Sequence, residues 1–179
     1  MAPILALTGF MGSGKTTVGR RASHLLGWDF LDLDAEVVSS SGRDIPHIFA
    51  HEGEAGFRLL EFRALCAVIE RSPRDRGLIL ALGGGTVTDP DSLDLLRRSA
   101  TVVYLDIDAE QAWQRVGGSD RPLARDRQAF YRLFETRQSV YHAAADRIVE
   151  VKGRSSEDAA LEVVAMARQL DAERSGGEA

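Results

Sequence analysis

Short apolar runs alternate with longer segments of helical period along most of the chain. Five of the runs predict strands, at residues 4–8, 29–33, 78–82, 101–106 and 147–151. Between them, apolar residues recur three and four positions apart, most clearly over residues 57–71, as they do on the buried face of a helix. This alternation predicts β-α units around a parallel sheet and therefore an α/β fold.

Capping residues place the starts of two helices. Asp89 precedes Pro90, the order typical of an N-cap followed by a proline in the first turn. Ser155 and Asp158 have the spacing of a capping box ahead of the last helical segment. There is no repeat and no linker, so we interpret residues 1–170 as one domain and the polar, glycine-containing end at 171–179 as a disordered tail.

The composition is typical of a soluble globular protein. The 179 residues are 44% hydrophobic and 27% charged. The longest stretch without Asp, Glu, Lys or Arg is residues 1–14, shorter than the roughly 20 apolar residues that span a bilayer. The first basic residue, Lys15, follows this stretch, whereas a secretory signal places a positive charge before it. We therefore expect a cytoplasmic monomer that does not associate with membranes.

Charge, cysteine and histidine content exclude several kinds of site. The net charge of −5 argues against the basic surface that nucleic-acid binding requires. The single cysteine, Cys66, excludes an internal disulfide, and its apolar neighbours favour core packing. The chain has no asparagine, so it lacks the Asn-Lys-x-Asp motif with which GTPases read guanine. His47 and His51 lack the glutamate of zinc proteases, and we interpret them as solvated or at the edge of the core.

A glycine-rich loop gives the strongest functional signal. Residues 9–16 match G-x-x-x-x-G-K-[ST] between an apolar strand and a predicted helix at 17–26, which is the context of a P-loop. The loop residues expected to bind a nucleoside triphosphate are Gly12, Ser13, Gly14, Lys15, Thr16 and Thr17. Lys15 would reach the β and γ oxygens and Thr16 would bind Mg²⁺. Phe10 and Met11 are bulky at the variable positions, and we expect them to leave the backbone cradle unchanged.

Polar residues at two strand ends predict the rest of the crevice. The third strand runs into glycines at 83–85 without a Walker-B carboxylate, so these glycines are either a simple turn or a place for close ligand approach. Asp32 and Asp34 lie two apart and would face the γ-phosphate together from a strand. We expect Asp32 to steady Mg²⁺ and Asp34 to orient an acceptor hydroxyl. For Asp34 the alternative role is the N-cap of a following helix. We see no such alternative role for Asp32.

Arginines dominate the basic residues, since 20 of the 22 are Arg. Their planar fork suits carboxylates and phosphates. Arg58 and Glu61 are neighbours on one helix face, as part of a site or as a surface ion pair of little consequence. Arg121 lies in a polar stretch at 117–127, which we interpret as a mobile lid whose arginine neutralises a phosphoryl group in transfer.

Together the motifs resemble those of the shikimate kinase family, over residues 4 to about 170. The matching segments are G-x-x-G-x-G-K-T-T-V-G at 9–19, D-x-D at 32–34, G-E-x-x-F-R-x-x-E at 53–61, L-G-G-G at 82–85, R-P-L at 121–123 and R-x-x-x-Y-x-x-x-A-D at 137–146. The P-loop is common to many families, but the other segments together are specific. The resemblance implies a three-layer P-loop fold of the nucleoside monophosphate kinase type, with a parallel sheet of order 2-3-1-4-5 and a mobile lid.

The resemblance also implies an activity: ATP- and Mg²⁺-dependent phosphorylation of the 3-hydroxyl of shikimate, a step toward chorismate and the aromatic amino acids. By motif position, Arg58 and Arg137 would hold the shikimate carboxylate, and Gly84 would bind shikimate through its backbone. Asp34 would contact the ring hydroxyls, as an orienting group first and a general base second. Arg121 would be the lid arginine.

The resemblance assigns adenine recognition to two further arginines. Arg115 and Arg154 fall where it suggests a clamp on the base, on which an arginine plane can stack. The alternative is two solvated arginines at helix ends. Of the two, we favour Arg115.

Two alternative functions follow from the residues alone. Another kinase of this architecture would act on gluconate or a nucleoside monophosphate, and gluconate also carries a carboxylate and hydroxyls. The spacing of the segments at 57–61 and 137–141 favours shikimate instead. A nucleotide-dependent binding protein would bind ATP without acceptor-dependent release of ADP, and the acidic and basic residues retained at the acceptor positions argue against it.

Overall fold

The computed structural model describes residues 2–73, 75–117 and 126–176, and its centre is a five-stranded parallel sheet. The strands are β1 Ile4–Thr8, β2 Asp29–Asp32, β3 Leu78–Ala81, β4 Thr101–Asp106 and β5 Arg147–Glu150. Their order is β2-β3-β1-β4-β5, and all neighbours are parallel. The predicted strands and the order implied by the resemblance are confirmed.

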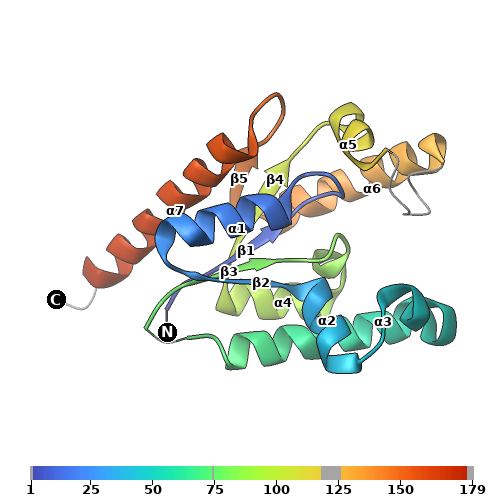
Figure 1. Cartoon of the computed structure of the whole chain (residues 1–179), viewed down its shortest axis with the longest axis horizontal. Helices are drawn as coiled ribbons and strands as arrows, with labels where there is room; N and C mark the ends of the chain where they lie inside the picture. Colours follow the sequence, from blue (N-terminus) through green and yellow to red (C-terminus); the bar gives the residue numbers. More distant parts are fainter. Residues whose placement is uncertain (1, 74, 118–125, 177–179) are drawn as a thin grey trace.

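Helices cover both faces of the sheet (Figure 1). They are α1 Lys15–Leu26, α2 Leu33–Ser41, α3 Ile45–Glu70, α4 Pro90–Ser99, α5 Ala109–Val116, α6 Arg127–Ala144 and α7 Ser156–Gly176, with a 3₁₀ turn, η1, at Thr86–Thr88. The chain runs from β1 to β2 in one direction and from β2 through β5 in the other. Right-handed crossovers therefore place α1, with α7 packed beside it, on one face and α3, α4 and α6 on the other. The result is three layers.

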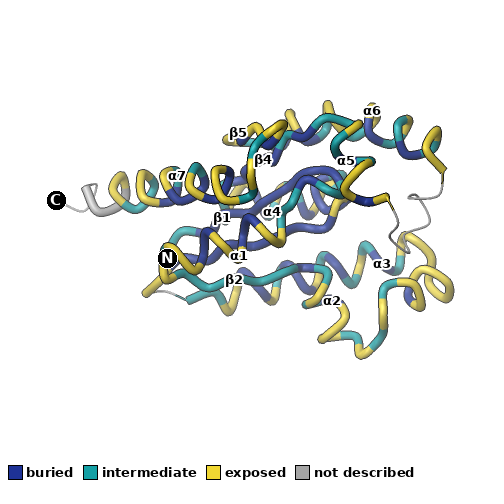
Figure 2. The backbone as a smooth tube through the Cα atoms, turned by 45° about the horizontal axis from the view of Figure 1, so that its top comes forward, coloured by how far each residue is buried: buried dark blue, intermediate teal, exposed yellow. Residues whose placement is uncertain are grey.

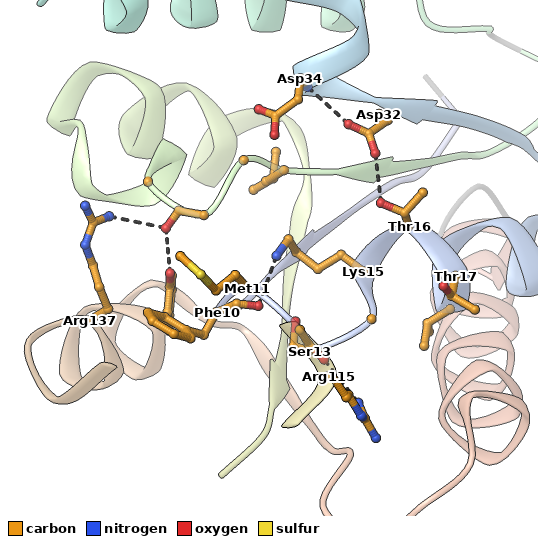
Figure 3. A pocket seen from close by; sticks show the side chains of 18 of the residues that line it. Phe10, Met11, Ser13, Lys15, Thr16, Thr17, Asp32, Asp34, Arg115 and Arg137 are labelled. Carbon is orange, nitrogen blue, oxygen red and sulfur yellow. Dashed lines mark hydrogen bonds between the residues drawn. The ribbon is translucent and has the colours of Figure 1, made fainter. Parts of the chain in front are cut away.

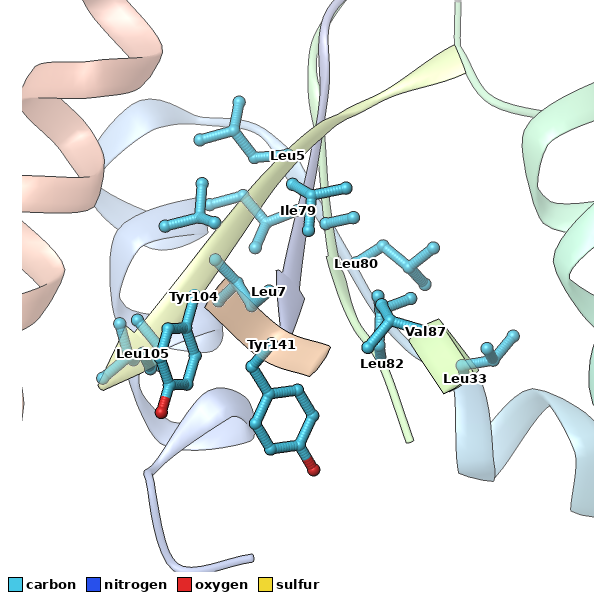
Figure 4. Close-up of a cluster of buried hydrophobic side chains, with 14 of the residues drawn as sticks. Leu5, Leu7, Leu33, Ile79, Leu80, Leu82, Val87, Tyr104, Leu105 and Tyr141 are labelled. Atoms are coloured by element: carbon cyan, nitrogen blue, oxygen red, sulfur yellow. The ribbon is translucent and has the colours of Figure 1, made fainter. Parts of the chain in front are cut away.

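Burial follows from this layering. β1, β3 and the middle of β4 are buried, while β2 at the sheet edge is half-buried throughout (Figure 2). A parallel sheet covered on both faces needs apolar residues at successive positions, which is why these strands appear in the sequence as continuous apolar runs. Leu5, Leu7, Ile79 and Leu80 are fully buried at the centre of this core (Figure 4).

Capping confirms both predicted helix starts. Asp89 accepts a hydrogen bond from the Ser92 N–H at 2.9 Å, and Pro90 begins α4. Ser155 and Asp158 each accept from the other's backbone N–H, at 3.1 and 3.3 Å, which is a complete capping box.

Two helices differ from their predicted extents. α7 continues to Gly176, beyond the expected boundary at residue 170. Leu170 packs against the core, and Gln169 donates to Glu173 at 3.0 Å one turn later, so the helix has contacts on both sides of that boundary. α3 begins at Ile45 rather than near Phe57 and is kinked at Gly53, whose φ of 68° is non-helical. Residues 177–179 lie outside the described part of the chain.

Other expectations concern single residues and membrane association. Cys66 is half-buried rather than fully within the core. His47 and His51 are exposed and stack at 4.0 Å between ring centroids, as expected for solvated side chains.

Among the described residues, we find no helix with the length and apolar content needed to cross a bilayer.

Candidate functional site

A pocket of about 1030 Å³ opens at the carboxyl ends of the strands. Its walls come from the P-loop, the end of β2, α3, the glycines after β3, α5, α6 and the start of α7. This edge of an open parallel sheet is where ligands bind, because the loops from several strands meet there. The volume is at the upper end of the roughly 300–1,000 Å³ usual for ligand pockets, so it suits two small ligands side by side.

The P-loop depends on glycine for its curvature. Gly9, Gly12 and Gly14 have φ values of 143°, 84° and 94°, in the region that favours glycine. A Cβ on Gly12 would lie 2.9 Å from the Ala112 carbonyl oxygen, so no other residue fits without displacing α5. Lys15 donates from Nζ to the Gly9 and Phe10 carbonyl oxygens, at 2.7 and 3.3 Å. The loop therefore has the form of a phosphate cradle with its lysine at the mouth.

Phe10 anchors this cradle to the opposite layer. Its ring is 2% exposed and meets Phe130 and Phe134 of α6 edge-on, each at 5.1 Å between centroids. The bulky residue is thus accommodated by an aromatic cluster behind the loop. Local sequence patterns do not reveal this contact, because the partners lie more than a hundred residues away in the chain and only the fold brings them together.

Asp32 connects the P-loop to α2. It accepts from the Thr16 hydroxyl at 2.8 Å and from the Asp34 N–H at 3.2 Å (Figure 3). Asp32 is therefore the N-cap of α2, and the interpretation that only Asp34 could cap a helix is wrong. β2 ends at Asp32 and α2 starts at Leu33, because the capping bond turns the chain at once into a helix. The two aspartates do not share a strand face, yet both line the pocket.

Arg58 belongs to an ion-pair network on the wall of the pocket, in which Glu61 is buried and Glu54 is exposed. It donates to Glu61 at 2.6 Å and to Glu54 at 3.3 Å. The Glu61 side chain is only 1% exposed and also accepts from the Thr86 hydroxyl at 2.6 Å. Burial lowers the pKa of Arg58, but Glu61 and Glu54 outweigh it and raise that pKa overall, so the guanidinium stays charged. The alternative of an inconsequential surface pair is wrong, because Glu61 is buried.

Gly83 and Gly85 make room for these charged side chains. A Cβ on Gly83 would lie 2.6 Å from Glu61 Oε1 and 2.8 Å from Asp34 Oδ1, and one on Gly85 would overlap the Arg58 guanidinium. A Cβ on Gly84 would lie 3.8 Å from the Tyr141 hydroxyl, at ordinary contact distance. The outer two glycines are buried and leave room for protein side chains, whereas Gly84 is exposed in the pocket that all three line.

Arg137 reaches the same glycines from α6. It donates to the Gly84 carbonyl oxygen at 3.2 Å and to the Thr88 hydroxyl at 3.3 Å. Tyr141, one turn later on α6, donates to the same Gly84 oxygen at 2.5 Å. Sequence analysis assigned Tyr141 no role, although its spacing from Arg137 places both on one helix face. The structure therefore places Arg58, Gly84 and Arg137 in one pocket.

Arg115 and Arg154, which we expect to contact the nucleotide, have different hydrogen-bond partners. Arg115 lines the pocket beside Ser13 of the P-loop (Figure 3) and donates to the Gly12 carbonyl oxygen at 3.2 Å. Arg154 also lines it but donates to Glu162 at 2.5 Å and to the Glu150 carbonyl oxygen at 3.1 Å. Thr17 is exposed at the rim. Arg121 and most of the expected lid at 117–127 lie outside the described residues.

Comparison with known proteins identifies the family. A family model for shikimate kinase matches residues 11–168. A shikimate kinase of Marinomonas sp. is 39% identical over 177 residues, which are 96% of each chain, and one of Salinispora arenicola is 41% identical over 169 residues, 93% of this chain and 98% of that one. This chain belongs to the shikimate kinase family. It is an ATP-dependent kinase of the shikimate pathway.

Solved structures agree with the family assignment. The shikimate kinase of Acinetobacter baumannii, solved in complex with shikimate, has a TM-score of 0.85 at 35% identity, covering 94% of each chain. That of Aquifex aeolicus has a TM-score of 0.76 at 32% identity, covering 94% of this chain and 98% of that one. A gluconokinase of Sinorhizobium meliloti reaches 0.63 at 17% identity. The last likeness shows a common fold alone, so it does not favour gluconate as the acceptor.

Proposed function

We propose that the protein transfers the γ-phosphoryl group of ATP to the 3-hydroxyl of shikimate. The observation that carries the proposal is that one pocket joins a complete P-loop to two arginines, an aspartate and an exposed glycine backbone. A small acid with several hydroxyls needs such a set: guanidinium groups for its carboxylate, a carboxylate for its hydroxyls and a close backbone approach.

The acceptor contacts are assigned by position in the pocket. Arg58 and Arg137 bind the shikimate carboxylate from two helices, and Gly84 contacts shikimate through its backbone. Asp34, in the first turn of α2, contacts the ring hydroxyls and directs the 3-hydroxyl at the phosphate. Phosphoryl transfer depends mainly on positioning and charge neutralisation, so Asp34 is an orienting group first and a general base second.

The nucleotide contacts lie along the P-loop and the pocket rim. Gly12, Ser13, Gly14, Lys15, Thr16 and Thr17 bind the phosphates. Arg115 stacks on adenine from α5, and Arg154 supports the base from the loop before α7, held in place by Glu162. Arg121 neutralises the γ-phosphate from a closing lid at 117–127.

Mg²⁺ is assigned to Thr16 and Asp32. Their oxygens lie 2.8 Å apart at the mouth of the P-loop, and hydroxyl, carboxylate and phosphate oxygens are the ligands this ion prefers. When bound, Mg²⁺ neutralises charge on the β and γ phosphates.

Asp32→Asn is expected to raise the Mg²⁺ concentration for half-maximal activity by about 10- to 100-fold. Asparagine caps a helix as well as aspartate does, so α2 and the melting temperature should be unchanged. The measurement is the initial rate against free Mg²⁺ at fixed ATP, with Asp29→Asn, on the same strand, as the matched control. An unchanged Mg²⁺ requirement would show that Asp32 does not hold the ion.

We further propose that the enzyme works as a monomer in the cytoplasm, where ATP is available, without a nucleic-acid partner. The acidic net charge of −5 supports the absence of nucleic acid. Light scattering on the purified protein tests the monomer, since a dimer would double the measured mass.

The position of the phosphate in the product tests the proposed reaction. The protein is incubated with MgATP and shikimate, and the product is analysed by ¹H–³¹P correlation NMR. We expect the phosphorus to couple to the ring proton at C3. Coupling to the proton at C4 or C5 would contradict the assigned orientation of the acceptor, while the nucleotide site would stand.

A further inference from the structure

Tyr141 meets Arg137 at a single backbone oxygen in the wall of the pocket. Its side chain is buried, and its hydroxyl donates to the Gly84 carbonyl oxygen at 2.5 Å. Arg137 donates to the same oxygen at 3.2 Å. Since the two residues lie one turn apart on α6, this helix supplies two donors to one acceptor.

The neighbouring glycine carbonyls are held by other residues. The Gly83 oxygen accepts from the N–H of Thr86 at 3.3 Å. The Gly85 oxygen accepts from the N–H and hydroxyl of Thr88, at 3.0 and 2.6 Å. Arg137 and Tyr141, which donate to the Gly84 oxygen, in contrast both lie on α6. If Tyr141 lost its hydroxyl, Arg137 would be the remaining donor from α6 to this carbonyl.

Arg137 has neutral acceptors, unlike Arg58. Its bonds go to a carbonyl and to the Thr88 hydroxyl, whereas Arg58 is bonded to two carboxylates. A carboxylate carries an opposite full charge and can accept two parallel bonds from a guanidinium, which a single neutral oxygen does not offer. An acceptor carboxylate can therefore draw Arg137 away from Gly84, and the Tyr141 hydroxyl then remains bonded to that carbonyl.

We propose that Tyr141 is a positioning residue for Arg137, an inference that rests on the proposed function. Tyr141 keeps the Gly84 carbonyl hydrogen-bonded when Arg137 leaves it, and so frees Arg137 to bind the acceptor carboxylate. The same bond fixes the direction of the Gly84–Gly85 peptide, because the carbonyl and N–H of a trans peptide point in opposite directions. Tyr141 thus acts on shikimate affinity through Arg137 and the glycine backbone, without a role in the transfer itself.

The hydroxyl is a donor throughout the neutral pH range. Burial raises the pKa of Tyr141 to about 12, with Arg137 and Arg58 acting in the lowering direction. The proton that bonds to the Gly84 oxygen is therefore retained under all conditions in which the kinase would be assayed.

Tyr104 provides a matched control. It is as fully buried as Tyr141, and the two rings lie 5.4 Å apart between centroids (Figure 4). Its hydroxyl donates to Asp106 at 2.9 Å on its own strand, β4, and Tyr104 is not among the residues that line the pocket. Tyr104→Phe and Tyr141→Phe each remove one buried, bonded hydroxyl and keep the ring.

The test compares wild type, Tyr141→Phe and Tyr104→Phe by initial rates with shikimate and MgATP. We expect Tyr141→Phe to raise the KM for shikimate about tenfold, with kcat and the KM for ATP within twofold of wild type. Tyr104→Phe should change none of the three, and melting temperatures show whether both variants are folded. An unchanged KM for shikimate in Tyr141→Phe would overturn the proposal. Failure of wild type to use shikimate would instead refute the proposed function.

A double-mutant cycle shows whether Tyr141 acts through Arg137. In an Arg137→Ala background, Tyr141→Phe should raise the KM for shikimate less than twofold further, because no guanidinium remains to be freed. A full additional tenfold increase would mean that Tyr141 acts independently of Arg137, and this outcome would contradict the proposal.

Discussion

Replacing Lys15 by methionine is expected to lower kcat by roughly 100- to 1,000-fold. The Lys15 ammonium group is held at the mouth of the P-loop by the Gly9 and Phe10 carbonyl oxygens, within reach of phosphates bound in the cradle. Charge develops on these oxygens during transfer, so losing the lysine should reduce kcat more than it raises the KM for ATP. The measurement is the initial rate at saturating MgATP and shikimate.

Lys152→Met is the control, because Lys152 is the only other lysine in the sequence. Its side chain is 72% exposed and lies 3.9 Å from Asp108. We expect wild-type kcat and KM from this variant. Turnover near that of wild type in Lys15→Met would contradict the assignment of the P-loop as the nucleotide site.

Arg58→Ala is expected to raise the KM for shikimate by about 10- to 100-fold, because it removes a charged contact with the carboxylate. The structure adds a second effect. Glu61 would lose its ion-pair partner while buried, keeping the Thr86 hydroxyl, and an uncompensated buried carboxylate costs about 3–5 kcal/mol of stability. Both the KM for shikimate and the free energy of unfolding are to be measured.

A double variant separates these two effects. Arg58→Ala combined with Glu61→Gln removes the unpaired charge while keeping an acceptor for Thr86, so stability should recover while the KM for shikimate stays high. Arg63→Ala, an exposed arginine on the same helix, should change neither quantity. If the double variant recovered shikimate affinity together with stability, Arg58 would be a structural residue and not an acceptor contact.

Local signals predicted most of the fold. The strands could be located because a covered parallel sheet requires uninterrupted apolar runs, and the starts of α4 and α7 because their caps use residues close in sequence. The kink at Gly53 escaped prediction, since the residues before it form a short separate helix, capped by Asp44 and with Pro46 in its first turn, and lack a strong apolar period.

The acceptor site shows where sequence reasoning ends. The resemblance to the shikimate kinase family identified Arg58, Gly84 and Arg137 by motif position, and the fold brings them into one pocket. Which bonds hold them depends on tertiary contacts: the burial of Glu61 against Thr86, and the bond from Tyr141 to Gly84, join residues 25 and 57 positions apart. The cap at Asp32 was misjudged for a related reason, because the strand ends one residue earlier than its apolar pattern suggests.

ADP release by the purified protein with MgATP, compared among shikimate, gluconate, AMP and no acceptor, tests the central claim most directly. We predict turnover with shikimate and only background release with the other three. Release with gluconate or AMP but not shikimate would contradict the acceptor site built on Arg58, Asp34 and Arg137. ATP binding without release for any acceptor would contradict the assignment of a kinase activity altogether.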